Sequence, residues 1–318
     1  MPTIGSIANK ILGTAGLQIT RVPKKAASDT KKRTDPIGKA QHLKTLSNDP
    51  TDHGAHLRYA EFCFHEGLFE LAYSEMRTAN YLGADGEILK NLAKKLEHAL
   101  TPLEEIAHNQ YYRLRSLANA ISEQGEALSV LDVGGGIGNL SRFIPNNPYC
   151  LAEPFVNGIS GEHLPFEDRS FDLVVACHVL EHIPTAGRDA FLDSLMSKAK
   201  KAVILINPFH SIESDERLEF IVNEWRSDWA QEHLDCEMPR TEDVMDYAKR
   251  RGLSCKMTPN ANISATFSLV WVDLLMQRKE TLDKWHRFNR FVNTKMMHMM
   301  DSEDFPTAYL TVLERKEM

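Results

Sequence analysis

The sequence has few cysteines, and none of them is paired in a recognisable motif. Five cysteines are scattered over 318 residues without a C-x-x-C pair. A disulfide framework and a structural zinc site therefore have no support, and the composition is typical of a reducing, cytoplasmic compartment. On this basis we expect no metal site.

The chain also lacks a long apolar run. No stretch approaches the roughly 20 residues that span a bilayer, and the first residues lack the apolar segment of a signal peptide. We therefore expect a cytoplasmic protein that is soluble or at most peripheral to the inner face of the membrane.

Most of the chain has no excess of positive charge. Residues 1–44 carry nine Lys/Arg against two Asp/Glu, a net charge of +7, whereas the whole chain carries −7. The remaining residues therefore carry −14, which argues against nucleic acid as a partner. The 42% apolar and 25% charged residues are ordinary for a globular protein, and the length allows one large domain and one small one.

Residues 1–40 are interpreted as a basic tail and linker. Ile4, Ile7, Ile11 and Leu12 share one helical stripe. One interpretation is a frayed tail that precedes a solvated linker. The alternative is an amphipathic helix within residues 1–35 that makes a weak contact with a membrane surface or a partner.

Residues 41–100 are predicted to form a small all-α helical unit. In Ala55–Asp85, apolar and small residues recur at helical spacing on both sides of Gly67. This segment resembles a single tetratricopeptide-type repeat of about 34 residues, and Ile88–Leu100 can supply the neighbouring helix that one repeat needs. Two interpretations stay open: a helical hairpin that caps the main domain, or a platform for a protein partner.

Residues 101–318 are predicted to form an α/β domain. Thr101–Ser122 has a helical pattern with Pro102 in its first turn. Strands and helices then alternate, which predicts a mostly parallel sheet with helices on both faces. Residues 215–245 and 261–303 are predicted insertions that cover the site. The predicted strands are Leu128–Val133, Tyr149–Glu153, Phe171–Cys177, Ala202–Ile206, Leu253–Met257 and Ala308–Glu314, and helices are predicted at about 140–144, 186–200, 241–251, 265–276 and 281–300.

A glycine-rich segment follows the first predicted strand. Val130–Asn139 reads VLDVGGGIGN, in which Asp132 ends the strand and Gly134, Gly136 and Gly138 permit a tight turn close to a ligand. Glu153 follows Asp132 by 21 residues, a distance at which an acid can accept hydrogen bonds from ribose hydroxyls. The pattern predicts a nucleoside-binding crevice. NAD binding, or a turn that merely needs positive φ, are the alternatives.

Two further segments resemble a known family. Leu164–Asp172 reads LPFEDRSFD and Val179–Pro184 reads VLEHIP. With the glycine loop, they resemble the class I S-adenosylmethionine-dependent methyltransferases of the branch with "LPF…FD" and "LEH" segments, which have a Rossmann-like fold. The last strand, Thr307–Glu314, is similar to the antiparallel edge strand of that family.

The resemblance implies S-adenosyl-L-methionine as cofactor and assigns residues to it. The glycine loop would face the methionine part and Glu153 the ribose. Gly161 and Glu162 would lie at the adenine, and Cys177 with His178 near the methyl group.

The sequence departs from the family at the adenine end. Ser160 occupies the position where the family has Asp, and Glu162 is a candidate substitute. The segment between Glu153 and Ser160 is too short for the usual helix and third strand. We therefore expect a sheet that is one strand short and an adenine pocket that is less enclosed.

Methyl transfer to a hydroxyl benefits from a base near the acceptor. The candidate catalytic bases are His210, His233 and His178, and His182 is a fourth histidine in the same region. A hydrogen-bonded structural role is the alternative for each. Arg113 precedes the first strand and could pair with the methionine carboxylate, or it could be a solvated charge on a helix.

The functional hypothesis is S-adenosylmethionine-dependent O-methylation of a small-molecule or glycan-type acceptor. The glycan suggestion depends on the basic amphipathic start and an "EHL" segment at Glu232–Leu234, which are similar to those of bacterial surface-polysaccharide methyltransferases. The alternative is a catalytically degenerate methyltransferase-like scaffold that binds partners through its helical repeat.

Overall fold

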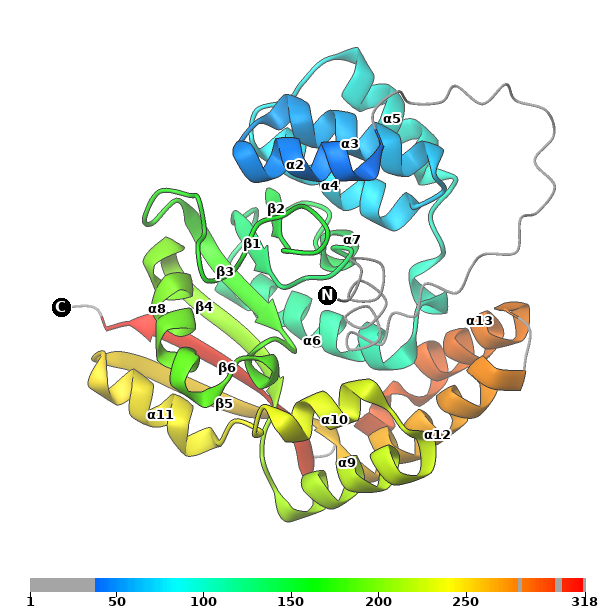
Figure 1. Cartoon of the computed structure of the whole chain (residues 1–318), viewed down its shortest axis with the longest axis vertical. Helices are drawn as coiled ribbons and strands as arrows, with labels where there is room; N and C mark the ends of the chain where they lie inside the picture. Colours follow the sequence, from blue (N-terminus) through cyan, green and yellow to red (C-terminus); the bar gives the residue numbers. More distant parts are fainter. Residues whose placement is uncertain (1–37, 280–281, 301–304, 317–318) are drawn as a thin grey trace.

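The computed structural model describes residues 38–279, 282–300 and 305–316. The predicted amphipathic segment within residues 1–35 lies outside the described residues. The described chain has a helical unit at one end, a central sheet with helices on both faces, and a group of helices at the other end (Figure 1).

The central sheet has six strands in the order β2-β1-β3-β4-β6-β5. Strands β1 to β5 run parallel to one another, and β6 runs antiparallel to its neighbours β4 and β5. The predicted α/β fold class is therefore confirmed. The strands are β1 (Val130–Val133), β2 (Tyr149–Ala152), β3 (Phe171–Cys177), β4 (Ala199–Pro208), β5 (Leu253–Asn262) and β6 (Pro306–Arg315).

The two edges of the sheet differ. The antiparallel β6 lies one position in from the edge, and β5 is outermost. At the other end β2 is the edge strand, and within the described residues no strand forms between Glu153 and Ser160. The expected shortage of one strand is thus confirmed on this side.

Alternate residues of the buried strands face opposite layers. Val130, Leu173 and Val175 pack in one apolar cluster with α6 (His108–Gln124), α7 (Leu140–Phe143) and the helical unit. Leu131 and Val174 pack in a second cluster with α8 (Arg188–Lys198) and α11 (Thr241–Arg250). Because a parallel sheet is covered on both faces, its strands are apolar at nearly every position.

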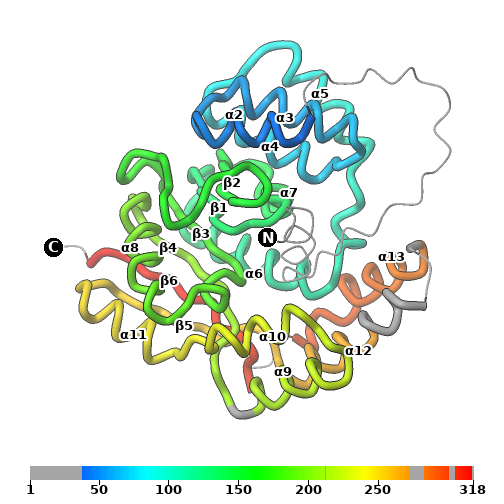
Figure 2. The backbone as a smooth tube through the Cα atoms, in the orientation of Figure 1, coloured from blue at the N-terminus to red at the C-terminus, as the bar shows by residue number. Residues whose placement is uncertain are grey.

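The N-terminal helical unit contains α2 (Lys39–Asn48), α3 (His53–His65), α4 (Phe69–Tyr81) and α5 (Glu87–Glu97). The Asp52 side chain accepts hydrogen bonds from the first backbone N–H groups of α3. Gly67, at φ +78°, forms the turn between α3 and α4, which the sequence placed at this residue. The backbone trace shows α4 lying against the β2 side of the sheet (Figure 2).

Helix α4 covers the edge that the missing strand would occupy. Leu151, in the middle of β2, donates its N–H to Thr78 Oγ1 across 2.9 Å, and its carbonyl accepts from Asn157 Nδ2 across 2.9 Å. These side chains satisfy backbone groups that a neighbouring strand would otherwise pair. The helical unit is therefore packed into the α/β core.

The helix predicted over Thr101–Ser122 is wrong at its start. A short 3₁₀ turn (η1, Leu103–Glu105) comes first, and α6 begins only at His108. Asn293 donates to the carbonyls of Glu104 and Ile106, and the N–H of His108 donates to Asn289 Oδ1. Side chains from a distant part of the chain thus hold the break and cap the helix.

Two helical groups lie at the carboxyl ends of the parallel strands (Figure 1). They are α9 (Ile212–Trp225) with α10 (Asp228–Asp235), and α12 (Ile263–Lys279) with α13 (Leu282–Phe291). The helix predicted to Met300 changes at Val292 into a π turn and then a 3₁₀ turn, in which Met297 and Met300 are buried. Among the described helices, none is long and apolar enough to span a bilayer.

Candidate cofactor and acceptor site

The glycine loop after β1 has the backbone that its sequence predicted. Gly134, Gly136 and Gly138 have φ values of +73°, +59° and +75°, a region that favours glycine. A Cβ atom on Gly134 would lie 2.4 Å from Val179 Cγ2. The loop therefore needs glycine at Gly134 both for its conformation and for close packing.

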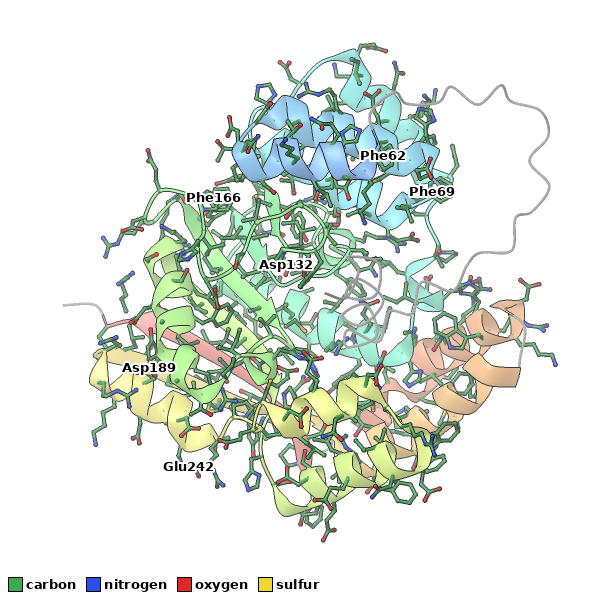
Figure 3. The ribbon with its side chains drawn as sticks, in the orientation of Figure 1. Phe62, Phe69, Asp132, Phe166, Asp189 and Glu242 are labelled. Carbon is green, nitrogen blue, oxygen red and sulfur yellow. The ribbon has the colours of Figure 1, made fainter. Side chains whose placement is uncertain are left out.

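Asp132 lies beneath this loop. The Tyr149 hydroxyl donates to Asp132 Oδ2 across 2.7 Å, and a Cβ atom on Gly135 would lie 2.3 Å from the same oxygen. Figure 3 shows Asp132 in the interior, between the helical unit and the sheet. Burial raises the pKa of this carboxyl to about 7. The structure thus places Asp132 as a support of the loop.

Glu153 follows β2 and reaches the same loop. Its Oε2 accepts the N–H of Gly136 across 3.1 Å, and its Oε1 accepts the N–H of Phe155 across 3.3 Å. Burial raises its pKa, against the two backbone hydrogen bonds that lower it. The side chain is 8% exposed. The carboxylate therefore lies next to the glycine loop, and each of its oxygens accepts a backbone N–H.

The helical unit contacts the glycine loop directly. Ser74 donates to the carbonyl of Ile137 across 2.9 Å, and a Cβ atom on Gly138 would lie 2.3 Å from Ser74 Cβ. Three residues along α4, Arg77 donates to the carbonyls of Ser141 and Ile144. Helix α4 thus braces the loop and the short helix that follows it.

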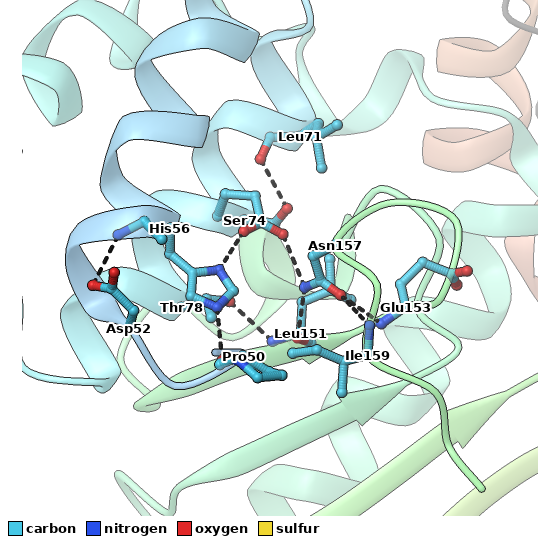
Figure 4. Close-up of polar contacts among 12 residues, drawn as sticks. Pro50, Asp52, His56, Leu71, Ser74, Thr78, Leu151, Glu153, Asn157 and Ile159 are labelled. Atoms are coloured by element: carbon cyan, nitrogen blue, oxygen red, sulfur yellow. Dashed lines mark hydrogen bonds and ion pairs between the residues drawn. The ribbon is translucent and has the colours of Figure 1, made fainter. Parts of the chain in front are cut away.

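A buried polar chain connects the helical unit with Glu153 (Figure 4). His56 Nδ1 lies 2.6 Å from Glu75 Oε2, and Glu75 Oε1 accepts from Asn157 Nδ2 across 3.0 Å. Asn157 Oδ1 in turn accepts the backbone N–H of Glu153 across 3.0 Å. His56, Glu75 and Asn157 are all fully buried. The residue expected at the ribose is therefore positioned from α3 and α4.

The end of β3 places Cys177 and His178 beside Arg113 of α6. His178 has φ +59°, a strained value for a residue other than glycine. Burial and the positive charge of Arg113 lower the pKa of His178, while burial raises that of the Cys177 thiol to about 12. The imidazole is therefore neutral near pH 7, as a general base must be.

Glu181 lies at the centre of a histidine cluster. Its Oε2 accepts from Asn207 Nδ2 across 2.7 Å, and its Oε1 lies 3.1 Å from His178 Nδ1. The rings of His182 and His233 pack edge to face, with centroids 4.8 Å apart. Burial raises the pKa of Glu181, but the surrounding histidines outweigh it and hold the value at about 2. The structure thus brings His178 and His233 together around a carboxylate, although 55 residues separate them.

His233 is buried in the cap, the helical group formed by α9 and α10. It lies on α10, is 6% exposed, and its Nε2 has no hydrogen-bond partner within the described residues. Burial lowers its pKa to about 3, so this imidazole stays neutral and is a weak base.

His210 lies on the loop after β4 but has different neighbours. Its Nδ1 is 2.9 Å from Asp215 Oδ2, and its N–H donates to the carbonyl of Pro239. A carboxylate partner of this kind orients an imidazole ring. The ring of His210 is therefore held by Asp215, a residue of α9.

Gly161 and Glu162, the residues expected at the adenine, differ in their surroundings. The carbonyl of Gly161 accepts from Ser194 Oγ across 2.9 Å, and a Cβ atom on Gly161 would lie 2.8 Å from both Phe191 and Val133. Glu162 is exposed, and its N–H donates to Ser160 Oγ across 3.3 Å. Gly161 is therefore required by packing, whereas Glu162 is accessible to a ligand.

Several residues of the site did not emerge from the sequence. Ser74, Glu75, Arg77 and Asn157 carry no motif, because their role depends on the packing of α4 against the loop. Asn207 had a weak signal, since it follows an apolar strand at the edge where ligands bind in such sheets.

Comparison with known proteins identifies the domain. Residues 106–256, which extend from just before α6 into β5, match the family described as methyltransferase domain. By sequence comparison, no curated protein matches the chain. The residues present fit S-adenosylmethionine, because the glycine loop after β1 and the Glu153 carboxylate after β2 are in contact, and the Arg113 cation acts on Cys177 and His178 at the end of β3. The chain therefore contains a methyltransferase domain over residues 106–256, which indicates S-adenosylmethionine as its cofactor.

Solved structures with a similar chain course include three methyltransferases. That of Thermotoga maritima is 15% identical, with 71% of this chain and 98% of that chain covered and a TM-score of 0.42. Magnesium protoporphyrin IX methyltransferase of Synechocystis, solved with S-adenosylhomocysteine, is 14% identical. The match covers 76% of this chain and 93% of that chain, with a TM-score of 0.38. Phosphoethanolamine N-methyltransferase 2 of Haemonchus contortus is 13% identical. The match covers 64% of this chain and 53% of that chain, with a TM-score of 0.40.

Proposed function

We propose that this methyltransferase acts on a hydroxyl group of a small-molecule or glycan-type acceptor. The observation that carries the proposal is the polar lining at the carboxyl ends of β3 and β4. His178, Glu181 and Asn207 meet His233 of the cap there, and Asn207 Oδ1 and His233 Nε2 have no hydrogen-bond partner within the described residues. Buried, unsatisfied polar atoms suit an acceptor that is itself rich in hydrogen-bonding groups.

The chemistry divides among the residues of this edge. The glycine loop and Glu153 hold the cofactor, and the cap excludes water from the reacting atoms. The acceptor oxygen attacks the methyl carbon as the carbon–sulfur bond breaks, so the products are a methyl ether and S-adenosylhomocysteine. The hydroxyl proton passes to a base, for which His210 is the first candidate and His178 the second.

The helical unit supports the site in this proposal. Ser74, Arg77 and the chain from Glu75 to Asn157 hold the glycine loop and the Glu153 turn. The face of α4 that a partner peptide would need is therefore occupied by the protein's own domain, and any partner would bind through the remaining surface of residues 41–100. We further propose a cytoplasmic setting and retain the basic residues 1–35 as a weak membrane-surface contact.

Calorimetric titration with S-adenosylmethionine, followed by methyl transfer from labelled cofactor to a panel of free sugars and nucleotide-linked glycans, tests the function. We expect cofactor binding and label in a base-stable methyl ether. Label in an amine or ester product would contradict O-methylation.

A separate test concerns the membrane contact. Deleting residues 1–35 should move the protein from a membrane pellet to the supernatant, and an unchanged distribution would exclude that contact.

A further inference from the structure

Glu181, His182 and His233 form a cluster beside the proposed acceptor site. One potential ligand atom from each side chain lies within 4.8 Å of the other two. Glu181 and His182 follow β3 in the 3₁₀ turn η2 (Leu180–His182), whereas His233 comes from α10 of the cap. The tertiary fold therefore brings together a carboxylate and two imidazoles from segments about 50 residues apart.

One ring nitrogen of the cluster, Nε2 of His233, lacks a hydrogen-bond partner among the described residues. His233 is 6% exposed, and within the described part of the chain its Nε2 has no hydrogen-bond partner. A buried imidazole nitrogen without a partner costs free energy comparable to a lost hydrogen bond. Asn207 Oδ1, beside the Glu181 carboxylate, is buried and unsatisfied in the same way.

The three side chains also have the right chemistry for metal ligands. A carboxylate supplies a negatively charged oxygen, and each imidazole supplies a ring nitrogen, which are common ligand types for divalent transition metals.

Side chains outside the cluster also contact two of its three members. Asn207 Nδ2 donates to Glu181 Oε2, and the Glu232 carboxylate lies 3.4 Å from His182 Nδ1. A carboxylate at one ring nitrogen orients an imidazole that ligates through the other, an arrangement common at metal centres. Ligands of one ion at about 2.1 Å would lie closer together than 4.8 Å. His182, which is 21% exposed, has the freedom to close this gap.

We propose that Glu181, His182 and His233 bind a divalent transition-metal ion. Two imidazoles and one carboxylate favour ions such as Mn²⁺, Co²⁺ or Zn²⁺ over Mg²⁺ or Ca²⁺, which prefer oxygen ligands. With three protein ligands, such an ion keeps coordination positions open.

A role in catalysis follows if the proposed O-methylation is correct, and this part of the inference rests on that function. The cluster lies at the carboxyl end of β3, one turn beyond Cys177 and His178. An acceptor hydroxyl bound to the ion would be fixed near the methyl group, and its pKa would fall. The ion thereby favours acceptors with two neighbouring hydroxyl groups, because both oxygens can occupy open positions.

Metal binding can be measured without any acceptor. The full-length protein is treated with a chelator, desalted and titrated with Mn²⁺ by electron paramagnetic resonance, and with Zn²⁺ by calorimetry. We expect one equivalent to bind and at least a tenfold loss of affinity in His182→Ala and in His233→Gln. His98→Ala, an exposed histidine of the helical unit, is the matched control and should bind as the wild type does.

The outcomes separate the metal proposal from the function. A folded protein that binds S-adenosylmethionine but no Mn²⁺ or Zn²⁺ would overturn the metal site and leave the methyltransferase assignment intact. Binding that persists in both His182→Ala and His233→Gln would place the ion elsewhere and would also overturn the proposal. Because His182 is partly exposed, its variant is expected to fold even if the His233 variant does not.

Discussion

His56 and Glu75 form a fully buried ion pair whose atoms Nδ1 and Oε2 lie 2.6 Å apart. The other ring nitrogen of His56 lies 3.0 Å from the carbonyl oxygen of Pro50. Both nitrogens thus face acceptors, which requires a protonated ring. The pair joins α3 to α4 and, through Asn157, fixes the backbone of Glu153. A carboxylate expected to bind the ribose is therefore held by an ion pair in a different structural layer.

The first prediction concerns stability against pH. Burial lowers the pKa of His56, but the Glu75 carboxylate and the Pro50 carbonyl outweigh it, so the net pKa is raised. A raised histidine pKa contributes stability that is present below about pH 6.5 and is lost as the pH rises through the folded value. We expect the Tm of the wild type to fall above pH 6.5, and His56→Gln to lower the Tm and remove this contribution. Thermal unfolding between pH 5.5 and 9 measures it, and parallel profiles for the two proteins would contradict it.

The second prediction concerns the cofactor. Glu153→Ala should weaken S-adenosylmethionine binding at least tenfold, because the ribose hydroxyls lose a charged acceptor. Asn157→Ala should weaken it by a smaller factor, since Asn157 only positions the Glu153 backbone. Calorimetric titration measures both, and Glu167→Ala, at an exposed acid, serves as control. An unchanged affinity in Glu153→Ala would remove this residue from the ribose.

The third prediction compares two glycines with nearly equal backbone angles. Gly138, at φ +75°, would place a Cβ atom 2.3 Å from Ser74 Cβ, whereas Gly67, at φ +78°, has no atom within 4 Å. Gly67→Ala should cost about 1 kcal/mol through backbone strain alone. Gly138→Ala should cost about 1–3 kcal/mol more through overpacking against α4. Chemical denaturation measures the difference, and equal losses would show that α4 does not press on the loop.

The fourth prediction concerns the base. His210→Ala should lower turnover by about 10²- to 10⁴-fold if His210 removes the acceptor proton, and it should leave cofactor affinity unchanged. His178→Ala is made in parallel, because this ring lies at the end of β3 beside Arg113 and Cys177. Initial rates with saturating cofactor decide between them. Full turnover in His210→Ala would transfer the role to His178.

The arrangement of strands and helices was largely predictable, and its details were less so. Apolar runs such as Phe171–Cys177 are buried on both faces, so their boundaries coincide with those of β3. The start of α6 was predicted seven residues too early, because Asn289 and Asn293, far along the chain, cap the helix and hold the turn before it. A sequence pattern predicts the start of a helix only when the residue that caps it is close by in the sequence.

The candidate site also contains residues that the sequence predicts and residues that it does not. Gly134, Gly138 and Glu153 were predictable because the loop geometry and the ends of parallel strands impose residue types at short range. Their support was not, since Ser74, Glu75 and Asn157 act only after α4 has packed beside β2. His233 likewise reaches Glu181 through the fold of the cap, and no spacing along the chain indicates that contact.

The amino-acid sequence by itself determined the glycine loop, the alternation of strands and helices, and the lack of a strand between Glu153 and Ser160 in the described part of the chain. These features depend on backbone angles and on periodicities that neighbouring residues specify. The tertiary structure alone decided that α4 takes the place of the missing strand, that His56 and Glu75 position Glu153, and that two histidines meet at Glu181. Such contacts join residues that are far apart in the sequence. They are needed only in the folded protein, where a polar group removed from water costs free energy unless it has a partner.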